Sequence, residues 1–113
     1  MPTPAPIAVF DDAVIEEIVR RVLSVASPQK IILFGSAAAG KLTRDSDIDL
    51  LIVESEPFDR RDEYLRIRRA LRGMGFPFDI LFISTEWFET SKDVIGGIAC
   101  PANKYGKVIY EAA

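Results

Sequence analysis

The sequence predicts an α/β fold, in the broad sense that includes α+β, with a small mixed β-sheet and flanking helices. Two observations support this class. Short apolar runs that end at Gly or Pro are typical of buried strands, and amphipathic segments with helical periodicity separate them. The length of 113 residues fits one domain over 1–113, with a loose proline-containing tail at 1–6. Strands that alternate with helices indicate the α/β class.

The first predicted element is a helix that begins at a cap formed by Asp11 or Asp12 and runs to about Ala26. Ser27-Pro28 ends it, because the residue before proline avoids the helical region. Apolar residues recur along it at helical spacing, namely Val14, Ile15, Ile18, Val22 and Val25. We expect this stripe to face the core.

Continuous apolar runs mark the strands. Lys30–Phe34 stops at Gly35, and Asp47–Val53 and Phe78–Ile83 have the same character, as expected for buried strands. Lys107–Tyr110 is predicted as a short last strand.

Two further helical segments are predicted between and after the strands. One runs from about Phe58 to Arg72, with Tyr64, Ile67, Leu71 and Met74 on one face, and ends at Gly73 and Gly75. The other is a short helix over 86–89, capped by Ser84 or Thr85, followed by a weakly helical stretch at 91–100. We expect Trp87 and Phe88 to belong to the core rather than to a partner contact.

The helix over 58–72 is rich in arginine, which raises the question of a nucleic-acid-binding face. We favour a solvated helix face, because no aromatic residues interleave with the arginines. Asp59, Asp62 and Glu63 also balance the charge in its first turn. The net charge of −3 agrees with this interpretation, since it gives no sequence-wide attraction to nucleic acid or anionic membranes.

Composition restricts the chemistry. The chain has no histidine, which removes imidazole acid–base catalysis, the Ser-His-Asp triad and imidazole zinc sites. Its single cysteine, Cys100, excludes an internal disulfide and is expected to be a small half-buried apolar residue. The proline-rich start lacks the features of a signal peptide, and no run is apolar enough for a membrane span. We therefore expect a cytoplasmic protein.

Two aspartates open the second predicted strand. Since side chains alternate along a strand, Asp47, Asp49, Leu51 and Val53 share one face, and Ile48, Leu50 and Ile52 share the other. The two carboxylates are then about 6 to 7 Å apart along the strand and repel each other unless a cation lies between them. Hard oxygen ligands in this arrangement suit Mg²⁺ or Mn²⁺.

A third carboxylate and a glycine turn complete the candidate site. Asp79 is the only charged residue in FPFDILFIS and would join the pair if its strand neighbours Asp47–Val53, either as a metal ligand or as a proton acceptor. Gly35-Ser36 follows a buried strand. The Ser36 hydroxyl and the next backbone N–H groups can hold phosphate oxygens. Together these features predict phosphoryl or nucleotidyl transfer from a metal-bound nucleoside triphosphate.

Each of these features also has an ordinary explanation. A Gly-Ser pair after a strand is most often just a turn, Asp45-Ser46-Asp47 can simply open a strand, and Asp79 can pair with an arginine. It is their joint order and spacing that favours an enzyme.

The chain contains Gly35-Ser36, followed after ten residues by Asp47-Ile48-Asp49. This pattern resembles the signature of the DNA polymerase beta-type nucleotidyltransferase superfamily. Gly40, Ser46 and Leu50-Leu51-Ile52 agree with it, and the short chain resembles the minimal nucleotidyltransferases (MNT) of prokaryotes. The resemblance implies Mg²⁺-dependent transfer of AMP from ATP to a hydroxyl. Ser36 would contact the triphosphate, Asp47 and Asp49 would hold the metal, and Asp79 would be the third carboxylate. One departure is Ala37-Ala38-Ala39, where relatives often carry arginines.

The resemblance also implies a partner. Minimal nucleotidyltransferases commonly accompany a helical HEPN-domain protein in toxin–antitoxin pairs. The nucleotidyltransferase is the antitoxin there and is implicated in adenylylating a tyrosine of the toxin. The chain has no obvious acceptor-binding domain, so we expect the acceptor surface to come from another protein or a second copy. Two alternatives stay open: a catalytically weak antitoxin that neutralises by contact, and a small-molecule nucleotidyltransferase.

Overall fold

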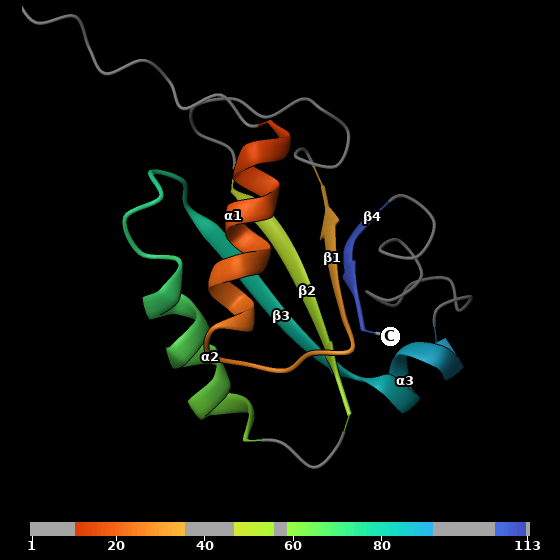
Figure 1. Cartoon of the computed structure of the whole chain (residues 1–113). Helices are drawn as coiled ribbons and strands as arrows, with labels where there is room; N and C mark the ends of the chain where they lie inside the picture. The colour runs from red at the N-terminus through yellow and green to blue at the C-terminus, as the bar shows by residue number, and fades with distance from the viewer. Residues whose placement is uncertain (1–10, 36–46, 56–58, 92–105, 113) are drawn as a thin grey trace, which may run out of the picture.

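The computed structural model describes residues 11–35, 47–55, 59–91 and 106–112 (Figure 1). Seven elements follow one another in the chain: α1 (Asp12–Leu23), β1 (Lys30–Phe34), β2 (Ile48–Glu54), α2 (Arg60–Ala70), β3 (Phe78–Ser84), α3 (Thr85–Ser91) and β4 (Lys107–Glu111). The predicted tail at 1–6 lies outside the described residues, as does the predicted stretch at 91–100 apart from its first residue. Ser36, Ala37-Ala38-Ala39 and Cys100 also lie outside them.

The strands form one mixed sheet in the order β3-β2-β1-β4. β2 pairs antiparallel with β1 and parallel with β3, and β1 pairs antiparallel with β4. A parallel pair needs a crossover connection, and α2 supplies it between β2 and β3 (Figure 1). The predicted mixed sheet with flanking helices is confirmed.

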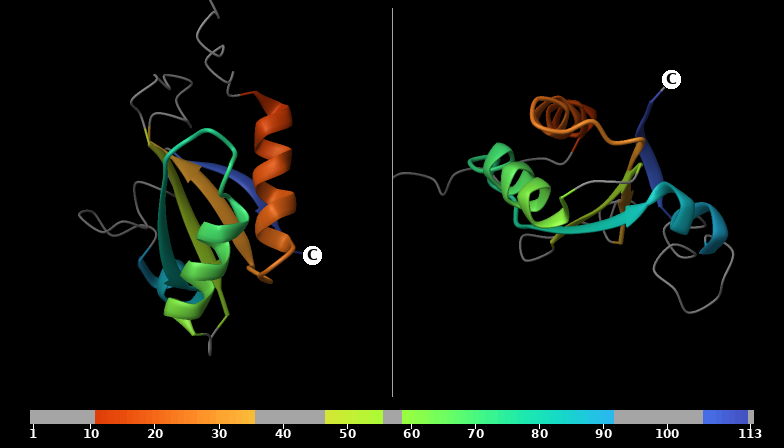
Figure 2. Two further views of the ribbon diagram at one scale, coloured as in Figure 1. Left: turned by 90° about the vertical axis from the view of Figure 1, so that its left-hand side faces the viewer. Right: turned by 90° about the horizontal axis from the view of Figure 1, so that it is seen from below.

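The two faces of the sheet carry separate apolar clusters. α1 and α2 lie on one side of the sheet (Figure 2). There the helices pack against β2 and its neighbours, in a cluster that includes Ile18 and Val22 of α1, Ile67 of α2, and Ile48, Leu50 and Ile52 of β2. On the other face, Phe88 of α3 packs with Ile32, Leu51, Val53 and Ile83. The predicted division of the second strand into two faces is therefore confirmed, and β2 is buried on both.

Helix boundaries differ from the prediction by a few residues. α1 begins at its Asp11 cap, whose Oδ1 accepts from the Val14 N–H at 3.1 Å, but it ends at Leu23 rather than Ala26. It ends early because the Ser24 hydroxyl donates to the Arg21 carbonyl at 2.6 Å and the chain then turns. α2 spans Arg60–Ala70, narrower than 58–72, because Asp59 is its cap and accepts from the Asp62 N–H at 3.0 Å.

The third helix corrects one expectation about the core. Ser84 caps α3, since the Trp87 N–H donates to its hydroxyl at 3.1 Å, as predicted. Phe88 is buried as expected, but Trp87 is 63% exposed and is not a core residue. Adjacent residues on a helix point in different directions, so only one of the two can face the sheet.

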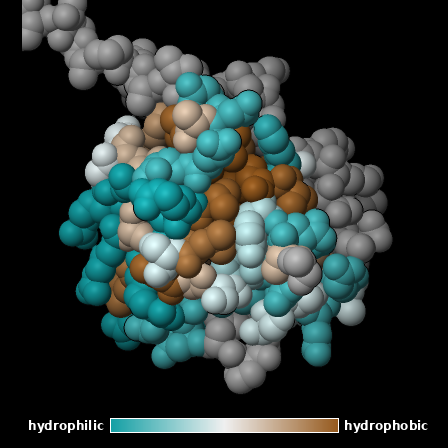
Figure 3. Space-filling model, viewed as in Figure 1, coloured by the Kyte–Doolittle hydropathy of each residue, from teal (hydrophilic) through white to brown (hydrophobic). Residues whose placement is uncertain are grey.

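The arginine-rich helix is only partly a solvated face. Hydrophilic side chains dominate the region of α2 in the space-filling view (Figure 3), and Arg60, Arg61 and Arg69 are exposed. Arg68 also donates to the Phe78 carbonyl at 3.1 Å, and Arg66 is bonded within the fold. Among the described residues, no helix is long and apolar enough to cross a membrane.

Candidate active site

The parallel pairing of β2 with β3 brings two predicted carboxylates together. Asp49 and Asp79 are register partners across the two strands. Residues in register on neighbouring strands point to the same face, here the face of α3 rather than that of α1 and α2. The predicted adjacency of these strands is confirmed, and with it the placement of Asp79 beside Asp49.

Asp47 lies just before β2, two residues from Asp49. It is exposed, as is Asp79, whereas Asp49 is half-buried. Asp47 precedes the first strand residue, Ile48, so strand pairing does not fix its position as it fixes that of Asp49. The site therefore has a half-buried centre and two exposed flanking carboxylates.

The described part of the site carries negative charge that no ion pair among the described residues balances. Burial raises the pKa of the Asp49 carboxyl above its ordinary value, and the charges of Asp79 and Asp47 raise it further. The ion pairs found in the described parts of the chain involve none of these three aspartates. A bound cation would relieve this repulsion.

Gly35 lies directly against the Asp49 carboxylate. Phe34, the residue before it, is the register partner of Asp49, and Gly35 turns the chain with φ +72°. A Cβ at this position would overlap Asp49 Oδ2 and lie 3.3 Å from Asp49 Cγ. Glycine is required here for its backbone conformation and for the space it leaves to the carboxylate. Ser36, which follows, lies outside the described residues.

The donor set suits a hard divalent cation. All three predicted ligands are carboxylates, and they carry more negative charge than the described surroundings balance. Within those described parts, however, no group of three or more His, Cys, Asp or Glu side chains is close enough together to hold an ion. The pair that the sheet holds in register is Asp49 and Asp79. Mg²⁺ commonly completes its coordination with water and substrate phosphates.

A second acidic group was not predicted from the sequence. Glu54 ends β2 and is only 4% exposed, and Glu63 of α2 lies beside it. The sequence shows Glu54 only as the start of a strand-ending Glu54-Ser55-Glu56-Pro57 segment. Its burial depends on how α2 packs over the end of β2, which no local pattern reveals. The i, i+3 spacing of Glu63 and Arg66 was the one available signal.

The family described as "Nucleotidyltransferase domain" matches residues 14–99, a range that includes both β2 and β3. No curated protein matches the chain in sequence.

Solved structures show a similar fold. One is a toxin–antitoxin complex with AMP-PNP, at a TM-score of 0.62 and 19% identity, covering 87% of this chain and 73% of the other. Another is a tri-AMPylated HEPN toxin of Shewanella oneidensis in complex with an MNT antitoxin, at a TM-score of 0.59 and 15% identity, covering 89% and 72%. A mutant of the toxin–antitoxin MntA–HpeT matches at a TM-score of 0.61 and 17% identity, covering 87% and 73%.

Proposed function

The chain belongs to the nucleotidyltransferase domain family, and on this basis we propose that it transfers AMP from ATP to a hydroxyl group of a partner protein in a reaction that requires Mg²⁺ or Mn²⁺. The observation that carries the proposal is the pairing of Asp49 with Asp79, against the Gly35 turn. These residues place unbalanced carboxylates beside a turn suited to a triphosphate.

Each residue has a role in this reaction. Asp47 and Asp49 would hold the metal, which when bound neutralises charge on the triphosphate. Asp79, exposed and in register with Asp49, would complete the metal site or accept the proton of the attacking hydroxyl. That oxygen forms a bond to the α-phosphorus, the bond from the α-phosphorus to the bridging oxygen breaks, and pyrophosphate leaves. Gly35 and Ser36 would contact the phosphates through backbone N–H groups and the Ser36 hydroxyl.

We propose a tyrosine of a HEPN-type toxin as the acceptor, with this chain as the antitoxin. The support comes from the structural neighbours, which include a complex of an AMPylated HEPN toxin with an MNT antitoxin. An acceptor surface supplied by a partner, and a hetero-oligomer, fit this support.

The test is incubation with labelled ATP, Mg²⁺ and the HEPN protein encoded beside the gene. We expect Asp49→Asn and Asp79→Asn each to lower label transfer by about a hundred-fold or more, because each removes a ligand or a proton acceptor. Asp12→Asn, in the exposed first turn of α1, is the matched control and should keep full activity. Equal transfer by Asp49→Asn and the parent protein would rule out the proposed roles.

A contact-only antitoxin is the second candidate, and one sequence feature favours it. The turn after Gly35-Ser36 reads Ala37-Ala38-Ala39 and supplies no cation for the triphosphate. In that case Asp49→Asn would still neutralise the toxin, and the parent protein would transfer no label. If Asp49→Asn loses both label transfer and the ability to neutralise the toxin, the result supports the enzyme.

A further inference from the structure

The end of β2 farthest from Asp49 carries a buried carboxyl group that the proposed reaction does not use. Glu54 is the last residue of the strand and is 4% exposed. It follows Val53, which faces α3, so its side chain lies on the face that α1 and α2 cover. A glutamate this deeply buried requires a partner for its charge or a proton.

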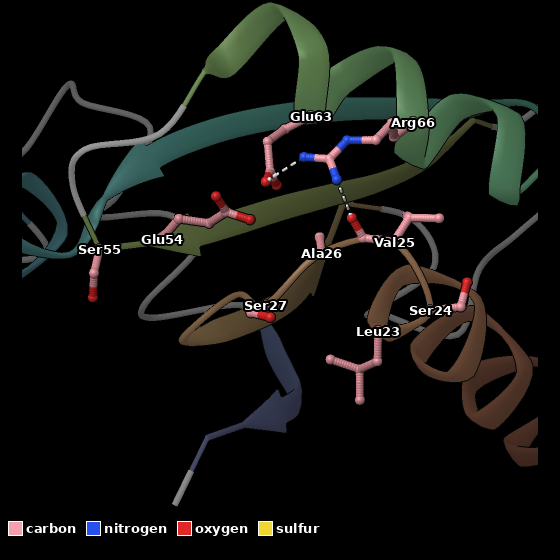
Figure 4. A pocket seen from close by; sticks show the side chains of 9 residues that line it. All are labelled: Leu23, Ser24, Val25, Ala26, Ser27, Glu54, Ser55, Glu63 and Arg66. Atoms are coloured by element: carbon pink, nitrogen blue, oxygen red, sulfur yellow. Dashed lines mark hydrogen bonds and ion pairs between the residues drawn. The ribbon is translucent and has the colours of Figure 1, made fainter.

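Two residues of α2 lie beside Glu54, and one of them is an arginine that binds other groups. Arg66 donates to Glu63 Oε1 and to the Val25 carbonyl, both at 2.9 Å (Figure 4). Its Nε lies 3.0 Å from Asp62 Oδ2. Arg66 is therefore shared between Glu63 and Asp62, and among the described contacts it neither donates to Glu54 nor forms an ion pair with it. In the described part of the chain, Glu54 Oε1 and Glu63 Oε2 are buried and have no hydrogen-bond partner.

These carboxyl groups line a cavity of about 570 Å³ (Figure 4). Its walls are the connection over 23–27, the end of β2 at Glu54 and Ser55, and α2 at Glu63 and Arg66. The connection adds hydroxyl groups at Ser24 and Ser27 and apolar surface at Leu23, Val25 and Ala26. The cavity thus combines an acidic end, hydroxyl groups and an apolar wall.

Without a ligand, a proton balances the charge. Burial, a hydrogen bond with Glu63 when the pair carries a proton, and the charge of Glu63 together raise the pKa of Glu54 to about 8, and the charge of Arg66 opposes them. The other charged neighbour on α2 is Asp62, which is exposed and paired with Arg66. Lys30 of β1 lies on the other face of the sheet, with its Nζ over the Phe88 ring and 4.0 Å from Glu111 Oε1. No described lysine or arginine other than Arg66 is hydrogen-bonded or paired within this group.

We propose that this cavity binds the primary ammonium group of an aliphatic amine, which replaces the proton between Glu54 and Glu63. An ammonium group carries one charge and three N–H donors, enough for an oxygen of each carboxylate and a serine hydroxyl. A divalent metal is disfavoured, because the Arg66 guanidinium is bonded to one of the two carboxylates and repels a doubly charged ion more strongly than a singly charged ammonium. The methylene chain of the amine would lie along Leu23, Val25 and Ala26.

The ammonium group can come from a free polyamine or from a lysine side chain of a partner protein. The probes are therefore 1,4-diaminobutane and a short peptide with a central lysine and blocked termini, each titrated by calorimetry at low salt. Tighter binding of the diamine points to a free amine, and tighter binding of the peptide points to a partner. In either case the amine displaces a proton, so we expect the affinity to rise between pH 6 and about 8.

Glu54→Gln should weaken binding by about ten-fold or more, since it removes a charge-assisted hydrogen bond. Glu16→Gln, exposed on α1, is the matched control and should leave the affinity unchanged. If the two variants lost the same affinity for the amine, surface charge alone would explain the loss, and the proposed site would be wrong. Failure of both amines to bind at millimolar concentration, or saturation by Mg²⁺ alone, would also overturn it.

A measurement on the parent protein covers the case in which Glu54→Gln fails to fold. The pKa of Glu54 is followed by carboxyl-carbon NMR with and without saturating amine. An ammonium ligand held by Glu54 must lower that pKa, whereas a carboxyl pair that binds only a proton leaves it unchanged. The second result would overturn the proposal.

Discussion

At the scale of single residues, Asp49 is placed by its strand and constrained by its neighbours. β1 brings Gly35 against its carboxylate, and β3 brings Asp79 into register with it. Gly35 leaves space for the Asp49 carboxylate, and Asp79 places a second negative charge beside it. Both therefore limit which substitutions the site tolerates. Substitutions at Gly35 therefore test the geometry of the site separately from its charge.

We expect Gly35→Ala to lower both stability and activity. Its φ of +72° costs a side-chain-bearing residue about 1 to 2 kcal/mol, and the new Cβ displaces the Asp49 carboxylate. Gly75→Ala is the control, because Gly75 has φ +88° and nothing within 4 Å of its Cβ position. Urea unfolding should show similar destabilisation for the two variants, whereas label transfer should fall only in Gly35→Ala. Similar activity in both would mean that contact with Asp49 is unimportant.

Glu54 predicts a pH dependence of stability. Its pKa is raised in the folded state from 4.5 to about 8, so the folded state binds a proton that the unfolded state releases over that range. The free energy of unfolding must then fall as pH rises through this window, by at most about 1.4 kcal/mol per pH unit. Glu54→Gln removes this loss, so its stability should exceed that of the parent increasingly toward pH 8. Parallel stability curves from urea unfolding would contradict this expectation.

At the scale of elements, an arginine of α1 adds hydrogen bonds to the apolar contact between α1 and α2. Arg21 of α1 donates to the Ala70 and Arg72 carbonyls at 3.2 and 2.9 Å, and its Nε donates to Glu17 at 2.8 Å. It thereby satisfies carbonyl groups at the end of α2 that have no partner within the helix. Its neighbour Arg20 pairs only with Glu17 among the described contacts and is exposed.

We expect Arg21→Ala to destabilise the protein by about 1.5 to 3 kcal/mol, the range for hydrogen bonds to a charged group. Arg20→Ala, the matched control, should cost less than about 1 kcal/mol, because an exposed ion pair contributes little. Chemical denaturation of the two variants measures the difference. Equal losses would show that helix charge, rather than the contact between helices, is what Arg21 provides.

Element prediction succeeded where the pattern was local. The strands were predicted within one residue, and the pattern is clearest for β1 and β2, because a continuous apolar run marks a strand that is buried on both faces. Helix ends were less accurate, since Ser24 and Asp59 compete for backbone groups that the periodicity counts as helical. Trp87 was misassigned because a seven-residue helix shows too few turns to identify its buried side.

At the scale of the whole molecule, the unbalanced carboxylates should couple ligand binding to stability. Mg²⁺ with a non-hydrolysable ATP analogue binds only the folded chain under our proposal. At a hundred-fold excess over Kd it should raise the free energy of unfolding by about 2.7 kcal/mol. Asp49→Asn should lose this increase, and EDTA should abolish it in the parent protein. A thermal-unfolding shift of equal size in Asp49→Asn would mean that the nucleotide binds elsewhere.

The sequence alone determined the positions of the strands and the amphipathic helix α1. It also determined that Asp47 and Asp49 share a strand face with Leu51 and Val53, and that Gly35-Ser36 and the two aspartates resemble the nucleotidyltransferase signature. All of these depend on local periodicity and spacing. The tertiary structure decided that β3 lies parallel beside β2, so that Asp79 stands in register with Asp49. It also decided that α2 buries Glu54 beside Glu63. Contacts between segments far apart in the chain depend on how the whole core packs, and no local pattern encodes that.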